Sequence, residues 1–333
     1  MAIHIQRREL ITLLGGVAAA WPFGTRAQQP GPTRRIAVLM AFAENDPEAQ
    51  VNIAAFRQAL QKLGWTDGRN VRIDYRWGGA DPERIRGYVI ELVGLKPDVI
   101  LVSTALVLQP LRQETRSIPI VFTQIGEPVQ SGFVASLAHP GGNITGFAAF
   151  EASVWGKSLE VLKEVAPHVA GVAVILNPDQ APQAGMWSAV EAAAPSLGVK
   201  ATATPVRNAI EIEHAINVFA REPNGGLIVL PSCPTIVHRE LIIALAARHR
   251  LPAIYPHRHF VAAGGLICYG LDLADQYRSA AAYVDRILRG EKPADLPVQQ
   301  PSKFELVINL TTAKALNLSI SESFLLRADQ VID

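Results

Sequence analysis

The sequence predicts an α/β protein with two similar lobes, each built on a parallel sheet that is covered by helices. Short apolar runs of strand length alternate with segments of helical periodicity. This alternation occurs in two successive sets, and the turn-rich segment 139–146 separates them. A length of 333 residues also exceeds one ordinary compact domain. Strand–helix–strand order of this kind requires parallel strands with helices on both faces of the sheet.

The first set contains two helix starts with the same chemistry. Asp46-Pro47-Glu48 and Asp81-Pro82-Glu83 each combine a capping aspartate, a proline suited to the first turn and an acidic residue near the helix N-terminus. Apolar residues then follow at helical spacing, and Gly64 is placed to end the first helix. The expected strands around these helices are residues 36–42, 71–77, 99–102 and 118–122.

The second set repeats the alternation after Gly141-Gly142-Asn143. A helix over 274–288 and a tail from Phe304 follow it, and either could lie on either lobe. The other elements expected in this half are helices over 153–165, up to about 197–198, over 209–220 and over 237–248, and strands over 171–176, 202–206, 227–230, 252–255 and 266–269.

The first 27 residues are typical of an export signal. Arg7-Arg8 precede an apolar run over 10–20, and Thr25-Arg26-Ala27 then places small residues where a signal peptidase needs them. The run is too short to span a bilayer, so we expect cleavage after Ala27 and a mature chain in the periplasm. The adjacent arginines suggest the twin-arginine route. The alternative interpretation is an ordinary amphipathic N-terminal helix.

Composition excludes several classes of protein. Hydrophobic residues make up 49% and charged residues 18%, as expected for a well-cored globular chain. The formal net charge is +1 and falls to −1 without the signal, which argues against a nucleic-acid partner. No later stretch offers 18 consecutive apolar residues. Cys233 and Cys268 could form a disulfide in an oxidising compartment, but two separate thiols are favoured.

Candidate site residues follow from the sheet geometry, because ligands bind beyond the carboxyl ends of parallel strands. Small polar residues dominate these positions, which suits a small ligand that carries an amine or hydroxyls. Each position taken singly could also be an ordinary polar strand end. The candidates are Asn45, Ser103, Thr104, Gln124, Glu127, Asn177, Ser232, Tyr255, His257 and Tyr269.

These candidates suggest how a zwitterion would be held. Glu127 would accept a ligand ammonium, although it could instead only cap a helix. Ser103 and Thr104, with the amides of a helix N-terminus, would hold a carboxylate. Tyr255 and Tyr269 would form a flat apolar wall. The expected ligand is an amino acid or a similar small zwitterion with an aromatic or apolar side chain.

Sequence signatures of catalysis are missing. The chain has no GxSxG elbow, no GxxxxGK[ST] phosphate loop, no HExxH and no GxGxxG after its first strand. His257-Arg258-His259 is the one dense pair of histidines, and no third histidine or carboxylate lies close in sequence. We therefore expect no enzyme activity, no cofactor and no metal site.

The chain resembles the periplasmic substrate-binding components of ABC transporters, in the TrpX-like branch of the type I binding-protein fold. The resemblance covers essentially the whole chain. It rests on the signal Arg7-Arg8-Glu9-Leu10-Ile11, on Leu63-Gly64-Trp65 with Gly68-Arg69-Asn70-Val71, on Ile118-Pro119-Ile120-Val121-Phe122, on Pro140-Gly141-Gly142-Asn143-Ile144-Thr145-Gly146, on Leu176-Asn177-Pro178, on Ala263-Gly264-Gly265-Leu266, on Ile287-Leu288-Arg289-Gly290-Glu291-Lys292-Pro293 and on Phe304-Glu305-Leu306-Val307-Ile308-Asn309.

The resemblance implies two Rossmann-like lobes that form a clamp with three hinge crossings, near Phe147, Asp272 and Val298. The first lobe would hold residues 34–147 plus 273–297, and the second would hold 148–272 plus 298–333. It also implies a monomer or weak dimer that delivers an amino acid or similar solute to an ABC permease in the inner membrane. Gly126-Glu127-Pro128-Val129 departs from the family's common Gly-Asp-Pro-Val.

An alternative function is an extracytoplasmic sensor that reports its ligand to a receptor kinase. Genes for a permease and an ATPase beside this one would favour transport, and a gene for a receptor kinase would favour sensing.

Overall fold

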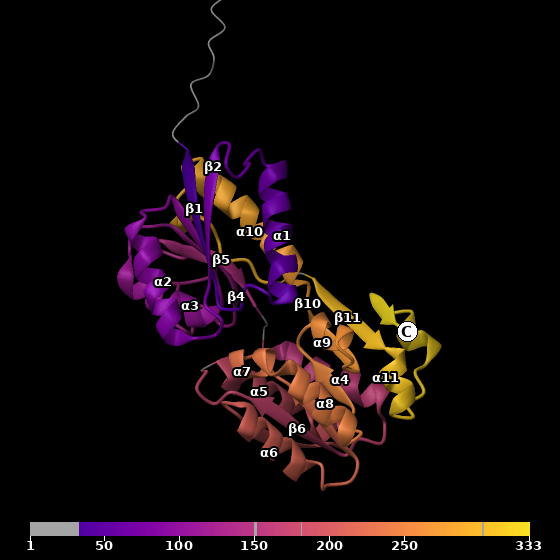
Figure 1. The fold of residues 1–333 in the computed structure, drawn as a ribbon. Coiled ribbons are helices and arrows are strands. Elements are labelled where there is room, and N and C mark those ends of the chain that lie inside the picture. Colours follow the sequence, from indigo (N-terminus) through magenta and orange to yellow (C-terminus); the bar gives the residue numbers. More distant parts are fainter. Residues whose placement is uncertain (1–32, 150–151, 181, 302) are drawn as a thin grey trace, which may run out of the picture.

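Two α/β lobes stand one above the other in the computed structural model, which describes residues 33–149, 152–180, 182–301 and 303–333 (Figure 1). The expected signal over 1–27, with its cleavage point at Ala27, lies outside these residues. None of the helices within them is both long and apolar enough to cross a membrane. Each lobe has its own sheet, and helices cover both faces of each sheet.

The sheet of the first lobe has five parallel strands in the order β2-β1-β3-β4-β5. Its core contains apolar side chains from both faces of the strands, as a doubly covered sheet requires. The elements of this lobe are β1 (Arg34–Met40), α1 (Pro47–Lys62), β2 (Val71–Trp77), α2 (Pro82–Gly94), β3 (Val99–Ser103), α3 (Thr104–Glu114), β4 (Ile120–Ile125), β5 (Ile144–Ala148), α10 (Leu273–Leu288) and the 3₁₀ helix η2 (Pro293–Asp295).

Both predicted helix starts in this lobe are confirmed. The Asp46 carboxylate accepts a hydrogen bond from the Ala49 amide at 3.0 Å, and Asp81 caps α2 in the same way. Helix α3 was not expected, because the apolar run of β3 continues into it without a turn signal and Pro110 lies inside it. This helix begins at the carboxyl end of β3, so its first turn faces the second lobe.

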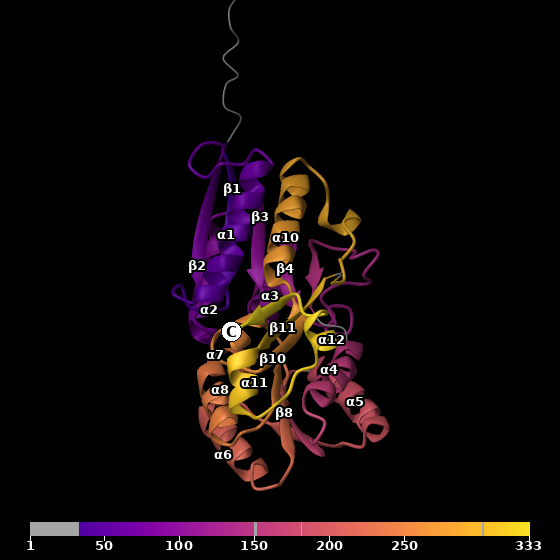
Figure 2. The same cartoon turned by 90° about the vertical axis from the view of Figure 1, so that its right-hand side faces the viewer.

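Helix α10 returns to the first lobe after β10 and packs beside α1, where Tyr277 and Val284 are fully buried (Figure 1). The tail from Phe304 lies on the second lobe, where its strands extend the second sheet (Figure 2). Two segments whose lobe the residue pattern left open thus lie on different lobes.

The second sheet has seven strands in the order β12-β11-β10-β9-β8-β6-β7. The sequence predicted parallel sheets, but the second sheet is mixed, because β11 runs antiparallel to β10. The chain leaves at the end of β10, visits the first lobe as α10 and returns to the same end, so Phe304 pairs with Leu271. The elements of this lobe are α4 (Ser153–Val165), β6 (Gly171–Leu176), α5 (Pro182–Ala193), η1 (Pro195–Leu197), β7 (Lys200–Pro205), α6 (Ala209–Phe219), β8 (Gly225–Val229), α7 (Cys233–Val237), α8 (Arg239–Arg248), β9 (Ala253–Tyr255), α9 (Arg258–Ala262), β10 (Ile267–Leu271), β11 (Phe304–Asn309), α11 (Leu310–Ala315), α12 (Glu322–Leu325) and β12 (Gln330–Ile332).

The predicted helix over 237–248 is confirmed as α8, which begins at Arg239, and the short helix α7 before it, which ends at Val237, was not expected. Cys233 lies at the start of α7 and is partly exposed, whereas Cys268 is buried in β10. Both thiols are free, as the sequence favoured.

The chain passes between the lobes three times, after β5, between β10 and α10, and between η2 and β11. The first and third crossings lie side by side. The Ala148 amide donates to the Gln299 carbonyl at 2.8 Å, and the Gln299 amide donates to the Gly146 carbonyl at 3.0 Å. The first and third crossings therefore connect the lobes as two adjacent chain segments that are hydrogen-bonded to each other.

Candidate functional site

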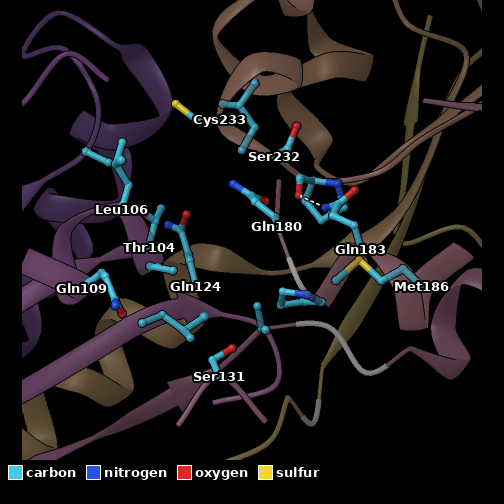
Figure 3. A pocket seen from close by; sticks show the side chains of 18 of the residues that line it. Thr104, Leu106, Gln109, Gln124, Ser131, Gln180, Gln183, Met186, Ser232 and Cys233 are labelled. Carbon is cyan, nitrogen blue, oxygen red and sulfur yellow. Dashed lines mark hydrogen bonds between the residues drawn. The ribbon is translucent and has the colours of Figure 1, made fainter. Parts of the chain in front are cut away.

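A cavity of about 530 Å³ lies between the two lobes, at the carboxyl ends of their strands. Figure 3 shows Thr104, Leu106, Gln109 and Gln124 of the first lobe facing Gln180, Ser232 and Cys233 of the second. A cavity of this size fits a small organic ligand rather than a polymer.

The lining is mostly apolar, with a few polar groups that converge on the same space. Side-chain amides and hydroxyls supply hydrogen bonds, and aromatic rings supply a wall. The apolar group includes Phe42, Leu106, Ile125, Phe133, Met186 and Ile236, and the polar group is Thr104, Gln109, Gln124, Ser131, Gln180, Gln183, Ser232 and His257, with Asp179 as the carboxylate.

Strained backbone marks the side of the cavity that the first lobe forms. Thr104 has φ +63° and Gln124 has φ +59°, which is a left-handed conformation that residues other than glycine rarely adopt. For β-branched Thr104 this is an outlier, and its buried hydroxyl has no hydrogen-bond partner among the described residues. Such strain is typical of ligand clamps, because the surrounding fold must hold it in place.

The N-terminus of α3 opens onto the cavity without a side-chain cap from Ser103. The Ser103 hydroxyl instead accepts a hydrogen bond from the Ala41 amide at 2.9 Å. The first-turn amides of α3 are therefore available to an anion, which the helix dipole also favours. Helix α7 differs, because Ser232 and Thr235 form a capping box at its start.

Asp179 and His257 are the titratable side chains among Asp, Glu, His, Lys and Arg in the described lining. The Asp179 carboxylate accepts two hydrogen bonds from Arg207, at 2.9 and 3.3 Å, and is largely exposed. Burial lowers the pKa of His257 well below its usual value, so its ring is neutral at pH 7. The charge of Arg207 balances that of Asp179, so the net charge around the cavity is close to zero.

Four of the ten predicted site residues line the cavity, namely Thr104, Gln124, Ser232 and His257. Three polar candidates lie elsewhere for identifiable reasons. Asn45 is exposed in the loop after β1, Ser103 is fully buried between β1 and β3, and the Asn177 side chain accepts from the Asp179 amide at 3.1 Å.

The structure also corrects the expected aromatic wall. Tyr255 is 1% exposed and stacks on Phe260 in the core of the second lobe, and Tyr269 stacks on Phe304. Neither lines the cavity, where Phe42 and Phe133 stand instead. Glu127 is half-buried just past Gly126, has φ +47° and does not line the cavity either.

Several lining residues escaped the strand-end rule because they lie on helices. Leu106 and Gln109 are on α3, and Gln183 and Met186 are on α5. Recognition of α3 would have revealed the first pair, since both follow a strand end by less than two turns of helix. No local signal distinguishes the second pair.

Direct contacts join the lobes beside the cavity. Asp46, which caps α1, forms an ion pair with Arg239 of α8 at 3.0 Å, and both side chains are less than a fifth exposed. Glu48 lies 3.7 Å from His259. Burial lowers the pKa of His259 to about 3, with a smaller contribution from the Arg239 charge, and burial raises the pKa of Glu48. This second contact is therefore not an ion pair at pH 7.

Residues 35–332 match the family model described as ABC transporter substrate binding protein. The chain belongs to this family. The match includes both lobes and all three crossings, and it is consistent with a cavity between lobes whose strands point their carboxyl ends at each other.

Several proteins are similar to the chain in sequence or in fold. A tyrosine-binding protein of Clostridioides difficile (strain R20291) is 26% identical over 264 residues, which cover 79% of this chain and 75% of that protein. Two crystal structures each give a TM-score of 0.83 and cover 90% of this chain and 100% of theirs. One is an ABC domain from Streptococcus pneumonia in complex with L-Trp, at 23% identity, and the other is a conserved domain protein from Vibrio cholerae, at 27%. The fold is therefore that of type I periplasmic binding proteins.

Proposed function

We propose that the chain is an extracytoplasmic receptor that captures an amino acid between its lobes and delivers it to an ABC permease. The observation that carries this proposal is the cavity itself, which takes lining from both lobes and opens onto an uncapped helix N-terminus. A ligand that bridges both lobes favours the closed arrangement over the open one by its differential contacts.

The proposed ligand is a neutral zwitterion with an aromatic or large apolar side chain. Its carboxylate would take hydrogen bonds from the first-turn amides of α3 and from the unpartnered Thr104 hydroxyl. Its side chain would pack against Phe42 and Phe133. The ligands named for two relatives, tyrosine and L-Trp, support this class.

For the ligand ammonium we propose Asp179 as the partner, because its carboxylate lines the cavity and that of Glu127 does not. The expectation for Glu127 stands as the competing assignment. A charge-assisted hydrogen bond lost in a closed cleft costs about 1.5–3 kcal/mol, or roughly ten- to a hundredfold in affinity. Isothermal titration of Asp179→Asn and Glu127→Gln with L-tyrosine and L-tryptophan separates the two assignments, since only the true partner should show this loss.

Native mass spectrometry of freshly purified protein tests the function directly. A retained mass that matches an amino acid and is lost on unfolding supports the receptor. Turnover of a bound solute would contradict it and support an enzyme. The residue pattern over 1–27, which we expect to be an export signal, supports export, and sequencing of the mature N-terminus tests it, with Gln28 as the expected first residue. No observation in the described structure favours the kinase-coupled sensor.

A further inference from the structure

We propose that Gln276 is a positioning residue that couples the cavity to the first crossing between the lobes. The proposal rests on the proposed function, because it concerns how capture of a ligand is linked to closure. It assigns a role to a side chain that does not line the cavity but is hydrogen-bonded to a residue that does.

Gln276 lies in the first turn of α10, and it is 7% exposed. Its side-chain oxygen accepts a hydrogen bond from the backbone amide of Gln124 at 3.3 Å. Its side-chain nitrogen donates to the carbonyl of Ala148 at 2.6 Å. One amide group thus joins a cavity residue on β4 to the last residue of β5, where the chain leaves for the second lobe.

The segment of β4 that Gln276 contacts is irregular. The pairing of β4 with β5 shifts register between Phe122 and Ile125, and Gln124 within this shift has φ +59°. The Ile125 carbonyl also accepts from the amide of Ala149 at 2.7 Å, and Ala149 lines the cavity. The irregular segment and the crossing are therefore joined twice, once directly and once through Gln276.

The chemistry of these contacts requires a glutamine. Gln124 presents a donor and Ala148 presents an acceptor, so the side chain between them must accept at one atom and donate at the other. Glutamate has the same shape but offers no donor, and asparagine is shorter by one methylene. Because both partners are backbone groups, the orientation of the Gln276 amide is determined by its neighbours.

Helix α10 also begins at the second crossing, where Asp272 caps it by accepting from the Asp275 amide at 3.0 Å. A rotation of the lobes therefore moves backbone on both sides of Gln276. A ligand that contacts Gln124 fixes the hydrogen-bond partner at one end of the Gln276 amide. The angle of the first crossing fixes the position of Ala148, the partner at the other end. Occupancy of the cavity and closure of the lobes act on the same side chain.

The test compares Gln276→Glu with the protein that retains Gln276, using spin labels on the two lobes at Ile90→Cys and Glu213→Cys. Both proteins carry Cys233→Ser, because Cys233 lines the cavity and its change must affect both equally. All three positions are at least partly exposed. Interlobe distances are measured without ligand and with saturating L-tryptophan or L-tyrosine. Gln58→Glu, on the exposed face of α1, is the matched control for the added charge.

We expect Gln276→Glu to shift the ligand-free distances to longer values, to close less at saturation and to bind at least tenfold more weakly, while Gln58→Glu behaves as wild type. A purely structural role would lower the melting temperature and leave distances and affinity unchanged below it, and that result overturns the proposal. Gln276→Met, which loses both hydrogen bonds without a charge, replaces the glutamate variant if that one does not fold. If wild type binds neither amino acid, the proposed ligand fails, yet the ligand-free distances still decide the role of Gln276.

Discussion

The ion pair between Asp46 and Arg239 should act as a latch for the closed arrangement. Its partners belong to different lobes, so separation of the lobes breaks the 3.0 Å contact and returns both charges to water. Arg239→Met keeps most of the side-chain volume and removes the charge. We prefer it to a change at Asp46, because Asp46 also caps α1 through the Ala49 amide.

The expected magnitude follows from burial. The side chains of Arg239 and Asp46 are 18% and 15% exposed, which lies between a surface pair and a buried one. Surface pairs contribute about 0–1 kcal/mol, whereas loss of one partner of a buried pair costs about 3–5 kcal/mol. A value of about 2 kcal/mol against the closed state corresponds to a roughly thirtyfold weaker apparent affinity.

Isothermal titration with L-tryptophan and L-tyrosine measures this effect, and interlobe distances report the accompanying opening. Arg86→Met is the matched control, because it removes an exposed pair with Glu83 inside one lobe. An affinity for Arg239→Met within twofold of wild type, with unchanged distances, would refute the idea of a latch. A loss of equal size in Arg86→Met would show that the effect is not specific to the interface.

Three further predictions concern stability and binding. Gly146→Ala should destabilise the fold by about 3 kcal/mol or more, since the new Cβ would lie 2.2 Å from the Phe122 carbonyl oxygen. Gly142→Ala is the control, because a Cβ at Gly142 would meet open space. Urea unfolding compares the stability of the two variants. Phe42→Ala should weaken L-tryptophan binding roughly tenfold by calorimetry, because half-buried Phe42 forms part of the apolar wall, and unchanged affinity would contradict this. Burial raises the pKa of Glu305 to about 7, so its contribution to the stability of the fold is full below about pH 4.5 and is lost as the pH rises through 7. Glu305→Gln should therefore gain stability relative to wild type between pH 5 and pH 8. A difference in stability that does not change with pH would count against this.

Local chemistry in the sequence predicted much of the scaffold. Asp46 and Asp81 mark their helix starts because a capping carboxylate and a following proline act within one turn, whatever the rest of the fold does. Alternation of strands and helices likewise predicted two α/β lobes, because each strand and helix must bury an apolar face. Helix α3 was missed, since its apolar residues continue those of β3 without a break.

The residues of the candidate site likewise include some that the sequence predicted and some that it did not. Thr104 and Gln124 were identified because strand ends in a parallel sheet converge at one edge, and this follows from topology alone. Tyr255 also follows that rule along the chain, yet its ring stacks on Phe260 in the core. Which face a side chain takes at a strand end depends on the loop that follows, and this loop is shaped by distant contacts.

The sequence by itself therefore determined the two-lobed α/β architecture, the helix caps and the edge of each sheet that faces the cavity, because these depend on interactions between near neighbours in the chain. Only the tertiary structure decided that β11 runs antiparallel to β10, that Phe42 and Phe133 line the cavity, and that Gln276 lies between the cavity and a crossing. Each of these depends on residues that are distant in sequence and meet only when the lobes and their crossings are assembled.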